Sequence, residues 1–262
     1  MSDVLDKAVK ILHALRPAGG EEELSATEIS RRLQLPVQSV HRLLRSLKQH
    51  GLVQKDGTTK KYRLGFAFLE YGFQLWNHLP FRAVSRPFME QLASKVNESV
   101  YLSMRDEDEG VYVDAIDSPQ VLKVSEPIGL RLPLYVGASN RVILAFMPER
   151  ERRQVLARAD WSRVPSLKFL TYEFVEEDLE NIRRNGYAVT EGEATEGTIG
   201  ISAPIFSYDH RVVGGISVAG PTFRFPSHKL SEARFLVMRT ARDISGELGW
   251  RGADRKQGKK MF

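Results

Sequence analysis

The stretch LPVQSVHRLLRSLKQHGLV, residues 35–53, decides the fold of the N-terminal part of the chain. Its apolar side chains recur at helical spacing, which predicts one buried face of an α-helix. These are Val40, Leu43, Leu44 and Leu47. The other faces carry Gln38, Ser39, His41, Arg42 and Arg45. The pattern leaves two alternatives for this polar side: an ordinary solvated surface, or a surface that reads a partner.

The sequence on either side of this helix predicts the elements around it. Helices are expected over residues 3–15 and 26–33, the second preceded by the capping-box pair Ser25 and Glu28. Pro36 suits a first helical turn and Gly51 suits a C-cap. LVQK and KYRL then predict two strands joined at DG, residues 56–57. Three helices followed by a hairpin predict a winged helix-turn-helix over residues 1–65.

Positive charge is concentrated in this predicted module. Residues 31–63 contain nine Lys and Arg against one acid, Asp56, whereas the whole chain of 262 residues has a formal net charge of only +5. A basic module beside a mildly acidic body indicates a polyanionic partner for the module alone. Charge by itself leaves open the alternative of a solvated basic surface.

The remaining sequence predicts a linker helix and a second domain. Residues 66–80 are rich in aromatic side chains and are expected to form a linker helix that makes dimer contacts. Pro80 interrupts the helical pattern, and the pair Arg86-Pro87 predicts a kink or a helix start. Residues 81–250 then mix helical segments with alternating strands, which predicts an α+β domain. Three of its expected strands are 99–106, 109–117 and 121–127. Residues 251–262 are predicted to be a basic flexible tail.

No pattern of an enzyme, a metal site or a cofactor site occurs in the sequence. HExxH, GxSxG, GxGxxG and the phosphate-binding loop are all absent, and the histidines have no metal-ligand spacing. The protein is therefore expected not to be an enzyme and to need no cofactor. The sequence contains no run of 18 apolar residues, so no membrane span is indicated. Because the chain has no cysteine, a cytoplasmic location is expected.

Two sets of motifs resemble the IclR family of bacterial transcriptional regulators. LSATEISRRLQLPVQSVHRLLRSLKQHGLV and YRLG are similar to its winged helix-turn-helix, and RLPLYVGASNRVILAF, RRNGYAV and ISVAGP are similar to its effector domain, in the same order. The resemblance covers about residues 3–250. It implies a GAF/PAS-like effector-binding domain, a homodimer or dimer of dimers, and double-stranded operator DNA and a small-molecule effector as partners. The expected function is repression of a catabolic or resistance operon in response to a small organic acid or aromatic compound.

The resemblance also implies which residues contact DNA. The start of the recognition helix would enter the major groove, where Gln38 and Ser39 can read base edges and Arg42 can bind guanine. His41 could contact either a base or a phosphate, and Arg45 can reach a phosphate. The expected contacts to the DNA backbone outside this helix are Thr27, Arg31, Lys60 and Lys61.

The effector site is carried over from the family by position. Leu132 and Leu134 would form an apolar wall, and the backbone amides near Ala138 and Ser139 would bind a carboxylate at a helix start. Ser217 would supply a hydroxyl group. The remaining positions are Thr190 with its neighbour Glu191, and Ala219.

This sequence departs from the family pattern at three positions of that site. Thr190 stands where an acid is frequent, Ala219 where a second serine is frequent, and Gly200 where a cysteine is frequent. Fewer polar groups predict an effector larger or less polar than a two-carbon acid. Tight binding of glyoxylate or pyruvate, without binding of any aromatic acid, would contradict this prediction.

Two alternatives to a ligand-responsive regulator stay open at the level of sequence. In one, the C-terminal domain binds a ligand or catalyses a reaction, and the helix-turn-helix contacts only protein. In the other, the protein binds DNA constitutively and responds to no ligand. Specific DNA binding discriminates against the first alternative, and a screen of metabolites by thermal shift discriminates against the second.

Overall fold

The structure is a computed structural model, and it describes residues 3–16, 23–161 and 170–252. The glycine-containing break after the first helix and most of the predicted tail lie outside these residues. The chain divides into two compact units, residues 1–78 and 79–262, which are described separately. Across the described part of the chain, no helix is both long and apolar enough to cross a membrane.

The N-terminal unit contains the predicted helix-turn-helix. Its helices are α1 (Asp3–Ala14), α2 (Ala26–Leu33) and α3 (Val37–Gln49). The Ser25 side chain accepts a hydrogen bond from the Glu28 amide, and the Glu28 carboxylate accepts one from the Ser25 amide, so the predicted capping box is confirmed. The predicted stripe of α3 is buried against α1 and α2. Ile11, Ile29 and Leu44 are fully buried at the centre of this core.

A short hairpin forms the wing of this unit. Strands β1 (Val53–Lys55) and β2 (Tyr62–Leu64) pair antiparallel, and Leu24 adds a backbone bridge to Tyr62. The turn between the strands is stabilised by Asp56, whose carboxylate accepts bonds from the amides of Thr58 and Thr59 at 2.9 and 2.6 Å. These three-helix and hairpin elements confirm the winged helix-turn-helix fold class.

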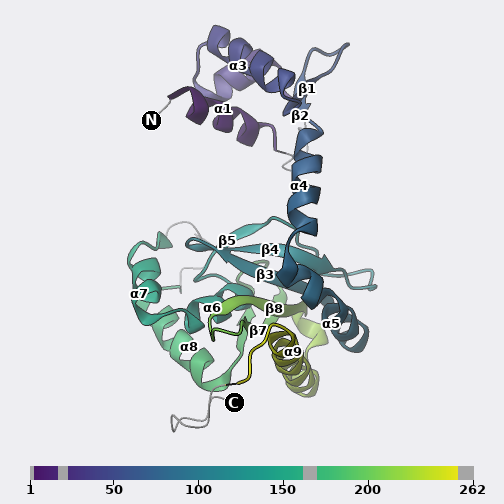
Figure 1. Cartoon of the computed structure of the whole chain (residues 1–262), viewed down its shortest axis with the longest axis vertical. Helices are drawn as coiled ribbons and strands as arrows, with labels where there is room; N and C mark the ends of the chain where they lie inside the picture. The colour runs from purple at the N-terminus through teal and green to yellow at the C-terminus, as the bar shows by residue number, and fades with distance from the viewer. Residues whose placement is uncertain (1–2, 17–22, 162–169, 253–262) are drawn as a thin grey trace. The chain divides into compact units, whose positions relative to one another are not determined.

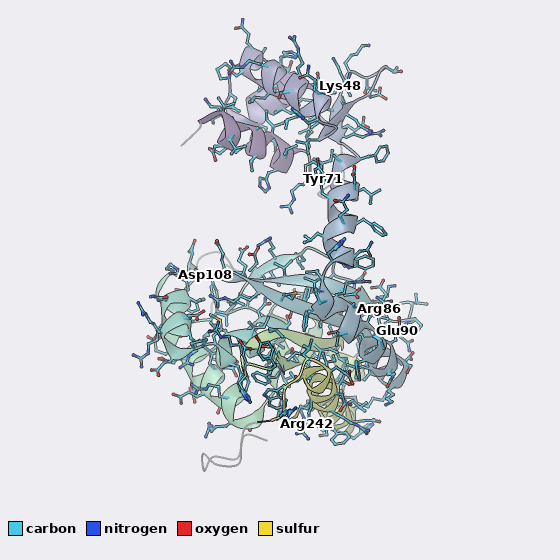
Figure 2. All side chains as sticks on the ribbon, viewed as in Figure 1. Lys48, Tyr71, Arg86, Glu90, Asp108 and Arg242 are labelled. Carbon is cyan, nitrogen blue, oxygen red and sulfur yellow. The ribbon has the colours of Figure 1, made fainter. Side chains whose placement is uncertain are left out.

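Two helices follow the wing. Helix α4 (Ala67–Asn77) has no buried residue, and α5 (Pro80–Val96) begins the second unit. The interruption predicted at Pro80 is a helix start, because a proline at the first helical position has no N–H to satisfy. Pro87 lies inside α5 and is not a helix start. Around Pro87, the surface of α5 carries an ion pair between Arg86 and Glu90, whose Nε and Oε1 atoms are 2.9 Å apart (Figure 2).

The second unit is built on a six-stranded antiparallel sheet (Figure 1). In sheet order its strands are β5 (Arg131–Pro133), β4 (Glu109–Ile116), β3 (Ser99–Asp106), β8 (Val212–Pro221), β7 (Thr198–Phe206) and β6 (Ala188–Glu191). The other elements are α6 (Ala138–Phe146), α7 (Glu149–Ala157), α8 (Tyr172–Asn185), the 3₁₀ turn η2 (Thr222–Arg224) and α9 (Ser227–Glu247). This α+β domain with helices around one sheet confirms the predicted class and is consistent with a GAF/PAS-like arrangement.

Alternation along the central strands creates two different faces of the sheet. Ile216 and Val218 of β8 pack in the core formed with α5 and α9. The intervening Ser217 faces the opposite side, toward the start of α6. That second side is filled by α6 and α8, and every residue from Ala138 to Ala145 is buried. The two-residue period therefore places the polar residues of the central strands beside α6.

One predicted strand is wrong. Residues 121–127 do not join the sheet, although their sequence alternates like a strand. Side chains of β3 hold this segment instead: Ser99 Oγ and Tyr101 Oη both donate to the Val124 carbonyl, at 2.6 and 2.9 Å. The segment consequently runs beside the sheet as a loop that carries Glu126 next to Tyr101.

Candidate DNA-reading surface and ligand pocket

The polar face of α3 is open to solvent. Gln38, His41, Arg42 and Arg45 are exposed, and Ser39 is half-buried at the helix start. The spacing of the apolar residues explains this arrangement, because it directs Val40 and the three leucines inward and leaves the remaining positions outward. The residues predicted to read bases are therefore free of the core, while their contact with DNA stays a prediction.

The predicted phosphate contacts lie on α2 and on the wing. Thr27 and Arg31 are exposed and stand one helical turn apart on α2. Lys60 is exposed at the wing turn, where its φ is +60° and its ammonium group donates to the Gly57 carbonyl. Lys61 is half-buried. Because an ammonium group has three donors, Lys60 can still donate to a phosphate while it holds this bond.

The described residues offset the positive charge of this surface only weakly, since Glu28 interacts at a distance with Lys61 and Arg31. Among the described residues, none forms an ion pair with Arg31, Arg42 or Arg45. The nearby carboxylates of Glu28 and Asp56 instead accept hydrogen bonds from the protein, chiefly from the backbone, and these bonds lower the pKa of both groups. The surface can therefore attract a polyanion.

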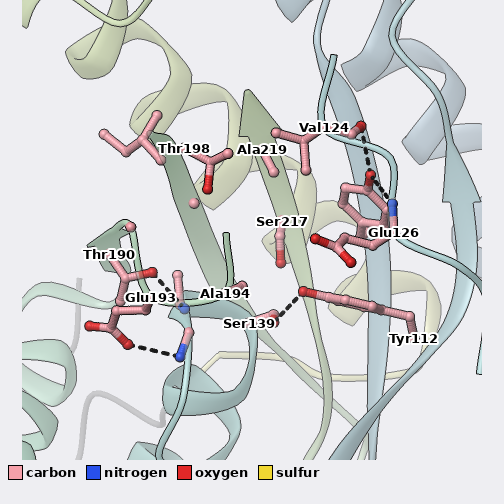
Figure 3. A pocket seen from close by; sticks show the side chains of 16 residues that line it. Tyr112, Val124, Glu126, Ser139, Thr190, Glu193, Ala194, Thr198, Ser217 and Ala219 are labelled. Atoms are coloured by element: carbon pink, nitrogen blue, oxygen red, sulfur yellow. Dashed lines mark hydrogen bonds between the residues drawn. The ribbon is translucent and has the colours of Figure 1, made fainter. Parts of the chain in front are cut away.

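A small pocket lies in the second unit between the start of α6 and the sheet (Figure 3). Its volume is about 40 Å³, which exceeds the roughly 10–15 Å³ that one buried water molecule needs. It is lined by Tyr101, Tyr112, Val124, Glu126, Gly137, Ala138, Ser139, Thr190, Gly192, Glu193, Ala194, Thr198, Ile199, Gly200, Ser217 and Ala219. This volume gives no support to the prediction of a larger effector.

Hydroxyl groups connect the walls of the pocket. Tyr112 Oη lies 3.2 Å from Ser139 Oγ, and Ser217 Oγ lies 3.1 Å from Ser202 Oγ. The rings of Tyr101 and Tyr112 lie side by side, with centroids 5.0 Å apart. Burial, with the charges of Asp117 and Glu126 as minor contributions, raises the pKa of Tyr101 to about 12. Burial, with a minor contribution from Glu126, also raises the pKa of Tyr112. Both phenols are thus neutral at physiological pH.

An ion cluster closes the deep side of the pocket. Arg141 is 1% exposed, and its Nη2 donates to both Glu193 oxygens at 2.7 and 2.8 Å. Its Nη1 donates to Asp178 at 2.8 Å. Burial raises the pKa of Glu193, although Arg141 and a hydrogen bond from the Gly137 amide act in the opposite direction. Arg141 thereby holds the loop of Glu193 against the start of α6.

Five of the eight predicted effector residues line this pocket: Ala138, Ser139, Thr190, Ser217 and Ala219. The other three do not. Leu134 is fully buried in the core beneath α6, and Leu132 lies on edge strand β5, where Gly110 of β4 is its partner. Glu191 is exposed, because the alternation of β6 directs the preceding Thr190 inward.

Sequence reasoning missed five polar pocket residues: Tyr101, Tyr112, Glu126, Glu193 and Thr198. The two tyrosines stand in predicted strands. The alternation of those strands could indicate which face of the sheet each tyrosine occupies, but not that this face contains a pocket. Glu193 lies only three residues after Thr190 and was the easiest to find. Glu126 had no signal, because its segment was predicted to be a strand.

A second cavity, of about 220 Å³, lies where the end of α5 meets the start of α9. Its buried carboxylate, Glu98, is paired with Arg224 by two hydrogen bonds, one of them 2.8 Å long. Both charges are therefore satisfied by each other. None of the predicted effector residues lines this cavity, so we take the pocket at α6 as the candidate effector site.

A winged helix-turn-helix joined to a pocket-bearing α+β domain defines the class of bacterial DNA-binding transcriptional regulators. The family described as IclR helix-turn-helix domain matches residues 4–57, and that described as Bacterial transcriptional regulator IclR C-terminal matches residues 73–246. The chain belongs to the IclR family. Its relatives are named as regulators of transcription.

Three similar proteins illustrate this relationship. The HTH-type transcriptional regulator KipR of Bacillus subtilis is 34% identical over 87% of this chain and 90% of its own length. The HTH-type transcriptional repressor AllR of Escherichia coli is 27% identical over 95% of this chain and 91% of its own length. The crystal structure of Thermotoga maritima IclR has a TM-score of 0.76 at 27% identity, covering 95% of this chain and 99% of that one.

Proposed function

We propose that this protein is a ligand-responsive repressor, in which the α3 surface binds operator DNA and the α6 pocket binds the effector. The observation that carries the proposal is the open basic face of α3, whose arginines have no ionic partner among the described residues. The name of AllR as a repressor supports the sign of regulation. A catabolic or resistance operon is the proposed target, and the cytoplasm is the proposed location because the operator lies on the chromosome.

The proposed DNA contacts divide into two kinds. Gln38, Ser39 and Arg42 stand at the leading end of α3 and are assigned to base edges in the major groove. His41 is assigned to either a base or a phosphate. The phosphate contacts are assigned to Thr27, Arg31, Arg45, Lys60 and Lys61.

A gel shift tests the proposal directly. The full-length protein is titrated onto the DNA upstream of its own gene and of the neighbouring operon, with unrelated DNA as competitor. Specific binding is expected at moderate salt. If no specific complex forms at any protein concentration, the alternative in which the helix-turn-helix contacts only protein is favoured instead.

Substitution of Arg42 by alanine is expected to weaken operator binding by about 1–3 kcal/mol, because a bidentate contact to guanine is lost. Fluorescence anisotropy with the operator measures the dissociation constant. Lys48→Ala is the matched control, since it also removes one exposed positive charge from α3 but near its end. An unchanged constant for Arg42→Ala would remove Arg42 from the reading set.

Lys60→Ala is expected to act on salt dependence rather than on sequence preference. Loss of one phosphate contact reduces the slope of log affinity against log salt by about one unit. Anisotropy titrations at four salt concentrations give this slope, and Lys10→Ala on α1 serves as a charge-matched control. If the slope is the same as in the unmodified protein, the wing lysine does not contact the DNA backbone.

A homodimer, or a dimer of dimers, is proposed for the assembly. Helix α4 exposes Leu69, Tyr71, Phe73 and Leu75, each more than half accessible, and it buries none of its residues in this chain. By helical spacing Leu69 and Phe73 share one face of α4, and Tyr71 and Leu75 share another. A second copy of α4 would cover one of these faces and gain the free energy of apolar burial. Light scattering of the full-length protein determines the mass and therefore tests this assembly.

The effector is proposed to bind at the α6 pocket. Polar groups from strands, loops and the start of α6 converge there, including Ser139, Ser217 and Glu126. Convergent polar groups in a cleft are the usual sign of a ligand site. The proposed effector belongs to one of the two classes that the sequence predicts, a small organic acid or an aromatic compound.

A further inference from the structure

We infer that the cavity between the end of α5 and the start of α9 is a second ligand site, which takes a small monoanion with an apolar body. A carboxylate on a ring or on a short aliphatic chain has this chemistry. Among the described residues, none lines both this α5–α9 cavity and the α6 pocket. The inference therefore goes beyond the proposed effector site and does not depend on it.

The α5–α9 cavity is large enough for a ring-sized ligand. Its volume is about 220 Å³, against about 40 Å³ for the α6 pocket. An apolar cavity of roughly 150 Å³ is sufficient for a benzene molecule. The two helices that border the cavity pack side by side within the second unit (Figure 1). The space between their ends can therefore hold a ring that carries one polar group.

Apolar side chains form one part of the lining. Ala233 is buried, and Val96, Phe225 and Leu236 are half-buried against the core that α5 and α9 share. A ligand in the cavity would remove more of this surface from water, and such burial is favourable. These side chains therefore provide a binding surface for a hydrocarbon body.

A glycine of β8 allows the charged and aromatic parts of the lining to lie against the sheet. A Cβ atom on Gly220 would stand 2.7 Å from Glu98 Oε2 and 2.9 Å from Phe225 Cε2, which is too close for either contact. The Phe225 amide also donates to the Thr222 carbonyl at 3.0 Å, at the end of the turn that carries Arg224. Packing and backbone hydrogen bonding thus fix this part of the lining.

The buried ion pair of the lining leaves donors for a ligand. Arg224 Nε and Nη2 donate to the two carboxylate oxygens of Glu98, a residue that is 5% exposed. The two charges offset each other, but Arg224 Nη1 forms no hydrogen bond with any described residue. Because a guanidinium group presents N–H donors on all three nitrogens, those of Nη1 can bind a further acceptor.

The remaining charges of the lining have a positive excess. Lys95 and Lys229 are exposed ammonium groups, and Glu232 is the other carboxylate of the lining. None of these three side chains forms an ion pair with a described residue. Both ammonium groups thus stand against a single carboxylate, beside the donors of Arg224. A negative charge on the ligand would balance this set, whereas a cation would increase the excess.

Methyl NMR of the full-length protein tests the inference, because alanine methyl groups report separately on the two cavities. Ala233 lines the α5–α9 cavity, whereas Ala138, Ala194 and Ala219 line the α6 pocket. Benzoate, benzyl alcohol and benzylammonium are titrated at equal ionic strength onto protein with carbon-13 in its alanine methyl groups. Benzoate is expected to shift the Ala233 signal saturably. It should bind there roughly tenfold more tightly than the other probes, because its hydrogen bonds are charge-assisted.

The double substitution Lys95→Gln and Lys229→Gln should weaken benzoate binding at Ala233 by roughly tenfold, because the positive excess of the lining is lost. Both lysines are exposed, so the fold should be retained. The matched control is Arg150→Gln with Arg153→Gln, which removes the same charge from exposed positions of α7 outside both cavities. The control should leave benzoate binding unchanged.

Several results would overturn the inference. These are no saturable shift of Ala233 with any probe, binding of benzylammonium as tight as that of benzoate, and an equal effect of the lysine and control substitutions. Benzoate shifts confined to Ala138, Ala194 and Ala219 would place the probe in the α6 pocket alone and would also contradict it. The gel shift on the same protein reports operator binding separately, so failure of the second site leaves the proposed function standing.

Discussion

Replacement of Arg141 by methionine is expected to lower the free energy of unfolding of the C-terminal unit by about 3–5 kcal/mol. The Arg141 guanidinium donates to Glu193, to Asp178 and to the Tyr135 carbonyl, the last at 3.1 Å. Methionine preserves most of the apolar volume but leaves the buried Glu193 carboxylate without a cation. The penalty is therefore electrostatic rather than a loss of packing.

Urea denaturation followed by tryptophan fluorescence measures this loss, because Trp161 packs on Tyr135 with ring centroids 4.7 Å apart. Arg153→Met is the matched control: its side chain is 68% exposed on α7 and pairs only with Glu149 among the described residues that form salt bridges. The control should change stability by no more than about 0.5 kcal/mol. A loss below about 1 kcal/mol for Arg141→Met would contradict the structural role of the cluster.

The same substitution should make stability depend more strongly on pH. Burial raises the pKa of Glu193 above its ordinary value of 4.5, while Arg141 lowers it. A raised pKa means that the folded state binds the proton more tightly, so stability falls as pH rises through the raised value. Without Arg141 the pKa rises further. The destabilisation caused by Arg141→Met should accordingly be larger at pH 8 than at pH 5, as urea titrations at both values would show.

Asp114→Ala is expected to have an effect of similar size, about 3–5 kcal/mol, on the C-terminal unit. The Asp114 side chain is 1% exposed and pairs with Arg82 Nε and Arg86 Nη1, each at 3.0 Å. Asp114 and Arg82 form an ion pair, but the geometry of this contact does not meet the angle that a hydrogen bond requires. Alanine would remove this ion pair from Arg82, whose side chain is only 15% exposed.

Asp114 reaches α5 because β4 contains an irregularity. Its register with β3 shifts between Leu102 and Ser103, because β4 has one residue more than β3 at this point, namely Val113. Val113 packs in the core beside α5, and Asp114 contacts the same helix. Tyr112, just before the shift, contacts Ser139 on the opposite side of the sheet. The bulge therefore separates a pocket residue from the residue that anchors α5.

Glu90→Ala provides the control for Asp114→Ala, because both carboxylates pair with Arg86. The Glu90 side chain is 59% exposed, so its removal should cost about 0–1 kcal/mol. Thermal and urea unfolding of the two variants give the comparison, and Asp114→Asn should lie between them. Equal stability of Asp114→Ala and Glu90→Ala would show that the buried ion pairs do not anchor α5.

Elements whose signals are local were predictable from the sequence. The capping box at Ser25 and the positive-φ glycine that ends α8, Gly186, depend on residues within one or two turns. The wing turn depends on Asp56 and its immediate neighbours. By contrast, residues 121–127 have the alternation of a strand, but side chains of β3 bind them as a loop. Contacts with residues distant in sequence therefore determine their conformation.

The candidate pocket could be predicted only in part. Ala138, Ser139 and Ser217 were found by their positions in family motifs, and they do line it. Leu132 and Leu134 were misplaced, because a motif gives the order of residues along a loop but not the side that each one faces. Leu134 turned inward to the core beneath α6, where its burial is complete.

The sequence by itself determined that residues 37–49 form a helix with one buried and one basic face, because helical periodicity is expressed within a few turns. It equally determined the alternation that directs Ser217 away from Ile216 and Val218. Only the tertiary structure decided the charge of the pocket. Glu126 and Glu193 lie far apart along the chain, and they line one cavity because the sheet order and the buried α6 bring their loops together.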